Sequence, residues 1–213
     1  MTKLKDGLLI VVEGIDGCGK TTFIKNLKTK LDEQNFEYLL TKEPGGSSIG
    51  QLIRDIVLIP RTPKVCSKAE YLLFAADRAQ HSKQVILPAL NEKKIVISDR
   101  MGDSSIVYQG YGRGLDIPTI KEINKWAMND RQPDIIFYLD LDVATAFKRI
   151  FARAEPLTSF EEEKEDFMQL AKNGFDELFK NRDNVLKLDA NEPSEQLAQH
   201  AIDFILKQIN NEQ

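Results

Sequence analysis

The feature that most constrains this chain is a glycine-rich stretch running from Gly14 to Thr21. It fits the pattern G-x-x-x-x-G-K-[ST] and lies between an apolar run, Leu8–Glu13, and a helical pattern, Lys20–Gln34. Glycines let the backbone wrap around a phosphate with its N–H groups turned inward, and the start of the helix adds the positive end of its dipole. The stretch therefore predicts a strand, a phosphate-binding loop and a helix, in that order.

Two side chains of this loop carry chemistry. Lys20 can reach the β and γ phosphates of a nucleotide, and the hydroxyl of Thr21 is placed for Mg²⁺, which needs oxygen ligands and keeps several waters. We therefore predict Mg²⁺ as cofactor, with Thr21 as its protein ligand and nucleotide phosphates and water as the others. Cys18 is expected to fill a slot for a small residue. The predicted nucleotide-binding residues are Gly14, Ile15, Asp16, Gly17, Cys18, Gly19, Lys20, Thr21 and Thr22.

Short apolar runs alternate with helical patterns along the rest of the chain. Further strands are expected at Phe36–Thr41, Ile95–Ser98, Ile135–Leu141 and Val185–Leu188. Helices are expected at Ile49–Leu58, Ser67–Leu90, Pro118–Met128, Val143–Arg153, Phe160–Phe179 and Ser194–Ile209. This alternation predicts an α/β fold with a parallel sheet of five strands, covered by helices on both faces. We expect one domain over residues 1–213, with ligands beyond the carboxyl ends of the strands.

Composition excludes several classes of protein. A net charge of −4 provides no basic field for a long nucleic acid, so we expect no such partner. No apolar run reaches the roughly 18 to 20 residues of a membrane span, so we expect no membrane association. The two cysteines are too few for a disulfide framework, and no apolar leader with a cleavage site opens the chain. We expect a cytoplasmic protein.

Two further clusters suggest what the nucleotide is used for. Asp99 and Arg100 follow the Ile95–Ser98 strand, at the edge of the sheet where sites are built. Asp99 can position metal-bound water, and Arg100 can donate two hydrogen bonds to the phosphate of an acceptor. Phe74 and Arg78 are four residues apart in a predicted helix and share one face, where the ring can stack on a base.

The next two clusters are a polar loop and a basic helix face. The run from Asp103 to Gly114 contains three glycines within five residues, so we expect a mobile loop, in which Ser105, Tyr108 and Gln109 read a base or ribose. Arg149 and Arg153 are four apart and are expected to share a helix face, from which they close over the γ phosphate. The predicted catalytic residues are Lys20, Arg100, Arg149 and Arg153.

Taken together, these segments resemble bacterial thymidylate kinases of the P-loop nucleoside monophosphate kinase fold, over nearly the whole chain. The matching motifs are Gly14–Thr22, Lys42–Gly46, Phe74–His81, Asp99-Arg100, Ser104-Ser105 and Tyr108–Gly110. The resemblance implies a three-layer fold, ATP on the loop, thymidine monophosphate (dTMP) in the facing cleft, a homodimer, and phosphorylation of dTMP to the diphosphate.

The resemblance also implies residue roles. Asp16 would contact the sugar hydroxyl, Phe74 would stack on thymine, and the arginines would contact the phosphate or base. The implied acceptor-binding residues are Asp16, Glu43, Pro44, Arg54, Phe74, Arg78, Arg100, Ser105, Tyr108 and Gln109. Gly17 stands where some members carry a catalytic arginine, so this chain resembles the subclass that carries its arginines in a lid, here at about 145–161. One segment departs from the family, because Thr158-Ser159-Phe160-Glu161 replaces an Asp-Arg pair before a hydrophobic-Glu pair.

Three alternative functions compete with this interpretation. A GTP-binding switch is disfavoured because Asn124-Lys125-Trp126-Ala127 lacks the aspartate of N-K-x-D. A deoxynucleoside kinase, whose acceptor carries no phosphate, stays open, although Arg54, Arg78 and Arg100 would then have no obvious purpose. Another nucleoside monophosphate kinase stays open as well.

Overall fold

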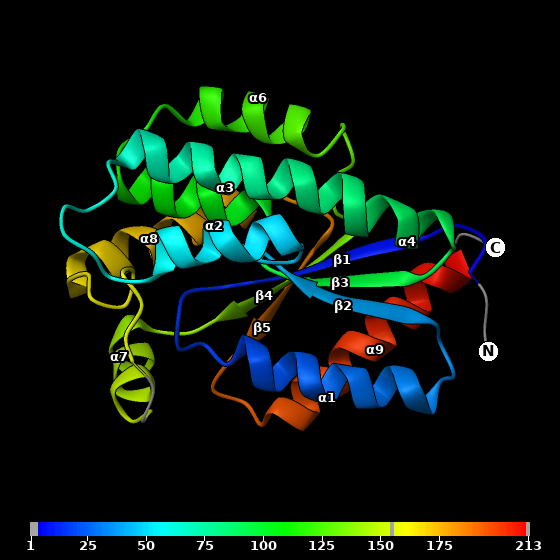
Figure 1. Cartoon of the computed structure of the whole chain (residues 1–213). Helices are drawn as coiled ribbons and strands as arrows, with labels where there is room; N and C mark the ends of the chain where they lie inside the picture. The colour runs from blue at the N-terminus through cyan, green and yellow to red at the C-terminus, as the bar shows by residue number, and fades with distance from the viewer. Residues whose placement is uncertain (1–3, 154–155, 212–213) are drawn as a thin grey trace.

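The central sheet is fully parallel. A computed structural model describes residues 4–153 and 156–211, and within these residues five strands form one sheet in the order β2-β3-β1-β4-β5 (Figure 1). The strands are β1 (Leu8–Glu13), β2 (Tyr38–Lys42), β3 (Ile95–Asp99), β4 (Ile135–Asp140) and β5 (Val185–Asp189). Val12 of β1 pairs with Asp99 on one side and Phe137 on the other. The predicted five-stranded parallel sheet is confirmed.

The helices form a layer on each face of the sheet. Figure 1 shows α1 and α9 below the sheet, packed on each other, and α2, α3 and α6 above it. The central strand β1 is buried along its whole length, as the apolar run Leu8–Val12 requires, and its last residue, Glu13, is buried as well. The helices are α1 (Lys20–Glu33), α2 (Ser48–Leu58), α3 (Ser67–His81), α4 (Leu87–Asn91), α5 (Gly102–Ser105), α6 (Ile117–Ala127), α7 (Val143–Phe151), α8 (Glu165–Phe179) and α9 (Ser194–Asn211), with wider π-helical turns η1 (Ser82–Ile86) and η2 (Ile106–Gly112).

The predicted helix Ser67–Leu90 is continuous but changes pitch. Helix α3 passes through η1 into α4 without a break. Pro88, in the first turn of α4, has no N–H to donate. The regular bonding ladder therefore fails there, and the backbone widens into a π-helical turn just before it.

The expectation of a mobile loop from Asp103 to Gly114 was wrong. Most of this segment is helical, in α5 and η2, and η2 packs closely against α8. Gly112 is a packing position, because a Cβ there would lie 2.7 Å from the ring of Phe167, whereas Gly114, at φ 74°, is a turn glycine with open space around it. Conversely, a Cβ on Gly174 of α8 would lie 2.9 Å from the ring of Tyr111. Close approach of η2 and α8, which a single sequence does not display, explains Gly112 and Gly174.

The helices on either side of the predicted lid are shorter than expected. Helix α7 ends at Phe151, and Arg153 donates its backbone N–H to Ile150, three residues back, so the last turn tightens and stops. The prediction that Arg149 and Arg153 share one helix face was therefore wrong. Helix α8 begins only at Glu165, because residues 158–163 form a separate turn. Residues 154 and 155 of the predicted lid lie outside the described part of the chain.

Candidate active site

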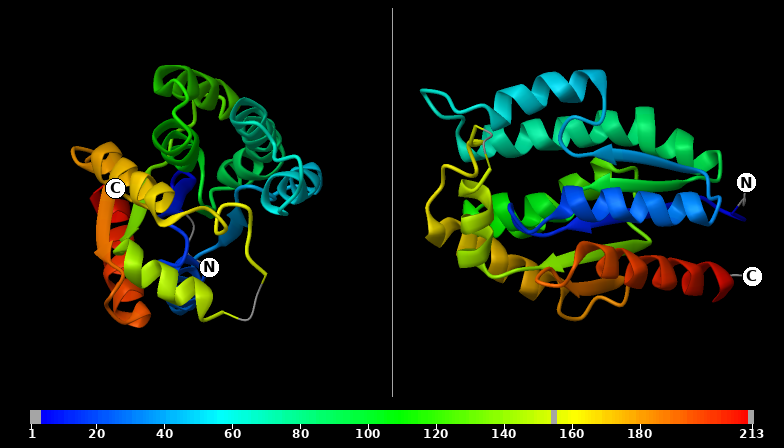
Figure 2. Two further views of the ribbon diagram at one scale, coloured as in Figure 1. Left: turned by 90° about the vertical axis from the view of Figure 1, so that its left-hand side faces the viewer. Right: turned by 90° about the horizontal axis from the view of Figure 1, so that it is seen from below.

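A cavity of about 620 Å³ opens at the carboxyl ends of the strands. The left view of Figure 2 looks onto this end of the molecule, where the segment that leads into α8, residues 156–164, crosses in front of the sheet. Most predicted site residues meet in its wall, from segments as far apart in sequence as the glycine-rich loop and α7. The predicted residues that line it are Asp16, Gly17, Gly19, Lys20, Thr21, Thr22, Glu43, Pro44, Arg54, Phe74, Arg78, Arg100, Ser105, Tyr108, Gln109, Arg149 and Arg153.

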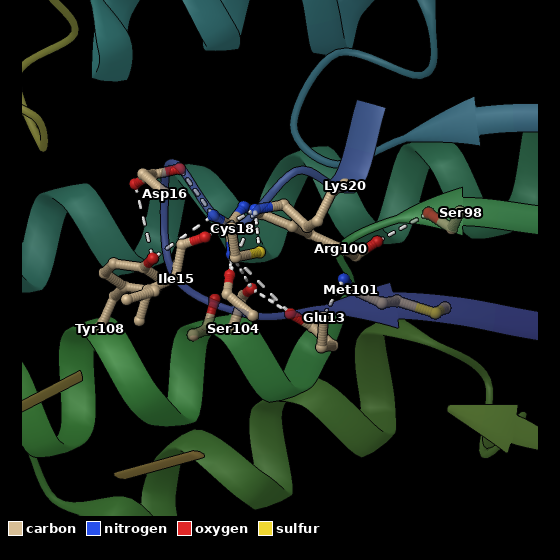
Figure 3. Close-up of polar contacts among 12 residues, drawn as sticks. Glu13, Ile15, Asp16, Cys18, Lys20, Ser98, Arg100, Met101, Ser104 and Tyr108 are labelled. Atoms are coloured by element: carbon tan, nitrogen blue, oxygen red, sulfur yellow. Dashed lines mark hydrogen bonds and ion pairs between the residues drawn. The ribbon is translucent and has the colours of Figure 1, made fainter. Parts of the chain in front are cut away.

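The glycine-rich loop forms one side of the cavity. It begins where β1 ends and leads into α1 at Lys20, with Gly19 in the left-handed region at φ 98°. The Lys20 ammonium donates to the carbonyls of Gly14 and Ile15, at 3.2 and 3.0 Å, so it is held against the loop (Figure 3). Burial raises the pKa of the Cys18 thiol, which suits a packing role. Of the predicted loop residues, Gly14, Ile15 and Cys18 are the ones outside the described cavity lining.

Arg100 ties the end of β3 to this loop. Its guanidinium donates to Asp16 at 2.7 Å, to the Gly14 carbonyl at 2.8 Å and to Ser104 at 3.1 Å (Figure 3). The hydroxyl of Tyr108 lies 3.3 Å from the same guanidinium. Burial opposes ionisation of Asp16, but the charges of Arg100 and Lys20 outweigh it and hold the pKa of that carboxyl below its usual range. Asp16 is therefore an anion beside a fixed cation.

Arg78 lies in the floor of the cavity and is 2% exposed. It donates to the Glu43 carboxylate at 3.0 Å, to the Asn124 side-chain oxygen at 2.7 Å and to the Ser105 hydroxyl at 3.0 Å. The second oxygen of Glu43 lies 3.2 Å from Nδ1 of His81. A buried guanidinium needs such partners, and they fix its orientation toward the cavity wall.

Two features of this network escaped the sequence analysis. Asn124 was considered only as part of an incomplete guanine-binding pattern. No local sequence pattern indicates that its side chain orients Arg78. Glu70 accepts from Gln109 at 3.0 Å. The sequence could have predicted that Glu70 lies near the site. Glu70, Phe74 and Arg78 follow each other at intervals of four residues and so share one face of α3.

Aromatic rings form another part of the cavity wall. Phe74 is half-buried and lines the cavity, with the ring of Phe160 at a centroid distance of 6.0 Å. Tyr108 packs edge-on against the same Phe160 ring at 5.6 Å. Phe160 was not among the predicted site residues. Its place on the rim follows from the unusual segment Thr158–Glu161, so the departure from the family lies directly at the cavity.

That segment is a capped turn docked on α2. The Thr158 N–H donates to the Glu161 carboxylate at 2.9 Å, and the Glu161 N–H donates to the Thr158 hydroxyl at 3.3 Å, the reciprocal pattern of a capping box. The Ser159 hydroxyl donates to the Val57 carbonyl at 2.6 Å. Glu161 also pairs with Arg153, while Arg149 donates to the Ala190 carbonyl at 3.1 Å.

Arg54 supplies a further cation. Its guanidinium donates to the Pro44 carbonyl at 2.8 Å and lines the cavity on the side of α2. Burial lowers the pKa of Arg54 from its usual value, as expected for a cation held in a partly dry site. An anion entering the cavity would relieve that cost.

The residues present fit a magnesium ion brought in by a nucleotide. Asp99, at the end of β3, lines the same cavity as Thr21, and its buried Oδ1 has no hydrogen-bond partner within residues 4–153 and 156–211. A carboxylate oxygen and a hydroxyl are the donors that a hard cation takes. In the same described residues, no group of three or more His, Cys, Asp or Glu side chains is arranged to hold a metal by itself. Most ligands would therefore come from phosphate and water.

Comparison with known proteins gives the family. The sequence profile described as "Thymidylate kinase" matches residues 12–201. The chain belongs to the thymidylate kinase family. It is 42% identical over 193 residues to the thymidylate kinase of Halothermothrix orenii, covering 90% of this chain and 92% of that one. It is 39% identical to the thymidylate kinase of Finegoldia magna, covering 95% of this chain and 99% of the relative.

A solved structure agrees with these family relatives. The crystal structure of thymidylate kinase from Ehrlichia chaffeensis superimposes with a TM-score of 0.73 at 30% identity, covering 94% of this chain and 99% of that one. The predicted P-loop nucleoside monophosphate kinase fold is thereby confirmed for this member of the thymidylate kinase family. No helix within its described residues is both long and apolar enough to cross a membrane.

Proposed function

We propose that this chain transfers the γ phosphoryl group of ATP to dTMP, giving ADP and thymidine diphosphate. Membership of the thymidylate kinase family supports this reaction, whereas a deoxynucleoside kinase is not favoured. The observation that carries the proposal is the presence, in one cavity, of a phosphate-binding loop and of guanidiniums from α2, α3 and the residue after β3. Two anionic substrates require two such cationic regions, and phosphoryl transfer requires that they face each other.

On the nucleotide side, the backbone N–H groups of Gly14 to Thr22 would hold the ATP phosphates. Lys20 would exchange its loop carbonyls for phosphate oxygens, since an ammonium prefers an anion to a neutral acceptor. Thr21 and Asp99, which line the same cavity, would hold Mg²⁺ together with phosphate and water. When bound, Mg²⁺ would offset the charge on the phosphates.

On the acceptor side, Phe74 would stack on the base and Asp16 would accept from the sugar hydroxyl. Arg100 and Arg54 would hold the acceptor phosphate, since both line the cavity and arginine matches phosphate oxygens two at a time. Arg78 would donate to an edge carbonyl of the base. Glu43, Pro44, Ser105, Tyr108 and Gln109 would complete the pocket.

Catalysis would come from positioning and charge stabilisation. Lys20, Arg100, Arg149 and Arg153 would donate to the equatorial oxygens of the transferred group, where negative charge spreads in the transition state. Arg149 and Arg153 belong to the proposed lid, about 145–161, of a single domain covering residues 1–213. The docked turn Thr158–Glu161 would help this lid to exclude water.

We also propose a cytoplasmic homodimer without nucleic-acid or membrane partners. An exposed apolar stripe made of Ile49, Leu52 and Ile56 of α2 and of Ile59, which directly follows α2, supports an interface between two copies. The net charge of −4 supports the absence of a nucleic-acid partner.

Product analysis tests the proposed reaction. The purified chain is incubated with ATP, Mg²⁺ and either dTMP or thymidine, and the nucleotides are separated by chromatography. We expect thymidine diphosphate and ADP in equal amounts from dTMP, and no thymidine monophosphate from thymidine. Phosphorylation of thymidine in preference to dTMP would instead establish a deoxynucleoside kinase.

A further inference from the structure

The side chain of Gln109, a member of the proposed acceptor pocket, has a buried partner, Glu70, to which the proposed reaction assigns no role. Gln109 is 2% exposed yet forms part of the cavity wall. Its Nε2 donates to Oε1 of Glu70 at 3.0 Å, joining η2 to α3 across a separation of 39 residues. Glu70 itself is buried, 7% exposed, and is outside the described cavity lining. It therefore contacts the site through Gln109.

Glu70 is a carboxylate held by a cation on its other side. Nε and Nη2 of Arg113 lie 3.4 Å from its two oxygens, and Nη1 of Arg113 reaches Glu163 at 2.7 Å. This pairing compensates the buried charge of Glu70. An ionised carboxylate only accepts hydrogen bonds, so the group of Gln109 that faces it must be the amide NH₂.

We infer that Glu70 is a positioning residue that fixes the amide orientation of Gln109 and thereby selects a pyrimidine with a hydrogen on N3. This inference rests on the proposed function. With its NH₂ group committed to Glu70, Gln109 turns its amide oxygen to the cavity, where it accepts from the N3–H of thymine. Cytosine presents an unprotonated N3, an acceptor, and two acceptors facing each other leave a buried polar group unpaired.

The reverse orientation of Gln109 is disfavoured by the same contact. Turning the amide would place its oxygen against the Glu70 carboxylate, which leaves two acceptors facing each other between two buried side chains with no hydrogen to share. Arg78 also favours thymine over cytosine. Its guanidinium can only donate hydrogen bonds, and its contacts with Glu43, Asn124 and Ser105 fix its position. A donor beside the base suits the O4 carbonyl of thymine and repels the amino group of cytosine.

The test replaces Glu70 by its isostere. Glutamine at position 70 can present either an oxygen or an NH₂ group, so in Glu70→Gln the amide of Gln109 is no longer fixed. We expect the ratio of the Kd for dCMP to the Kd for dTMP, measured by titration calorimetry, to fall about tenfold, the size of one mispaired hydrogen bond. KM for dTMP should rise as its Kd rises, while kcat should change less than about threefold.

Glu163→Gln is the matched control. It removes the other carboxylate that pairs with Arg113 and leaves the Gln109 contact in place. It should keep the binding ratio within about twofold of the wild type. An equal fall in both variants would assign the effect to Arg113 and overturn the inference, as would an unchanged ratio in Glu70→Gln.

A second variant and a double-mutant cycle keep the test decisive if Glu70→Gln folds poorly. Glu70→Asp keeps the charge for Arg113 but withdraws it from Gln109, and it should also lower the binding ratio.

In a Gln109→Leu background either change at position 70 should alter the binding ratio less than about twofold, because the side chain through which Glu70 acts is gone. A full effect there contradicts the inference. Wild-type activity on dTMP separates the two claims, since its absence would refute the proposed function itself.

Discussion

The Nη2 atom of Arg100 lies 2.7 Å from Oδ1 of Asp16, and this contact joins the end of β3 to the glycine-rich loop. The same guanidinium also donates to the carbonyl of Gly14, the first residue of that loop (Figure 3). A side chain proposed to hold the acceptor phosphate is thus anchored to the loop proposed to hold ATP. The two substrates would be placed relative to each other by one rigid pair of residues.

Asp16→Asn should disturb this anchor without removing bulk. The loss of one charge-assisted hydrogen bond, worth about 1.5–3 kcal/mol, should raise KM for dTMP or lower kcat by roughly ten- to a hundredfold in kcat/KM. Steady-state kinetics at saturating ATP give the value. Asp32→Asn, an exposed change on α1, is the control and should match the wild type. Equal kinetics for the two variants would contradict the role of the anchor.

Arg153→Ala tests the lid. We expect kcat to fall about a hundredfold, as when one donor to a transition-state oxyanion is removed, while KM for ATP changes less than about threefold. Lys148→Ala provides the comparison, because Lys148 is an exposed cation of α7 outside the described cavity lining. It should leave kcat unchanged. A wild-type kcat in Arg153→Ala would remove this arginine from the catalytic group.

Gly174→Ala tests the packing of α8 on η2. Alanine favours a helix, yet its Cβ would lie 2.9 Å from the ring of Tyr111, so we expect a net destabilisation of about 1–3 kcal/mol by urea unfolding. Asn173→Ala, on the exposed side of the same helix, should stay within about 0.5 kcal/mol of the wild type. A stabilised Gly174→Ala protein would show that the two helices are not in close contact.

Glu13 should make stability depend on pH. Burial raises its pKa from 4.5 to about 7, so the folded state favours the protonated carboxyl. Its stabilising contribution is complete below pH 4.5 and is lost as pH rises through 7. Relative to Glu13→Gln, the wild type should lose roughly 3 kcal/mol of unfolding free energy across this window. Unfolding curves of both proteins that stay parallel from pH 4.5 to 7 would contradict this assignment.

The parts of this molecule that the sequence predicted are those set by local pattern. The strand at Leu8–Glu13 was placed to the residue, because continuous apolar runs and a glycine turn carry their own signal. The predicted family and fold are confirmed by the relatives and by the superposed crystal structure. The predicted roles of individual site residues stay predictions, although most of these residues line one cavity.

What the sequence did not predict depends on contacts between distant segments. Gly110 and Gly112 were taken for a flexible loop, since a glycine that lets two helices approach looks the same in sequence as one in a turn. Asn124 reaches Arg78 across 46 residues, and no local pattern announces such a partner. The turn Thr158–Glu161 fits a capping box, but its docking through Ser159 on Val57 spans 102 residues.

The central claim is that one cavity brings ATP and dTMP together, and the initial rate of ADP formation tests it most directly. The purified chain, ATP and Mg²⁺ are assayed with dTMP, dUMP, dCMP, dAMP, dGMP or no monophosphate. We predict the highest kcat/KM with dTMP and a background rate without an acceptor. ADP formation at one rate whichever monophosphate is present, or none with any of them, would contradict the account.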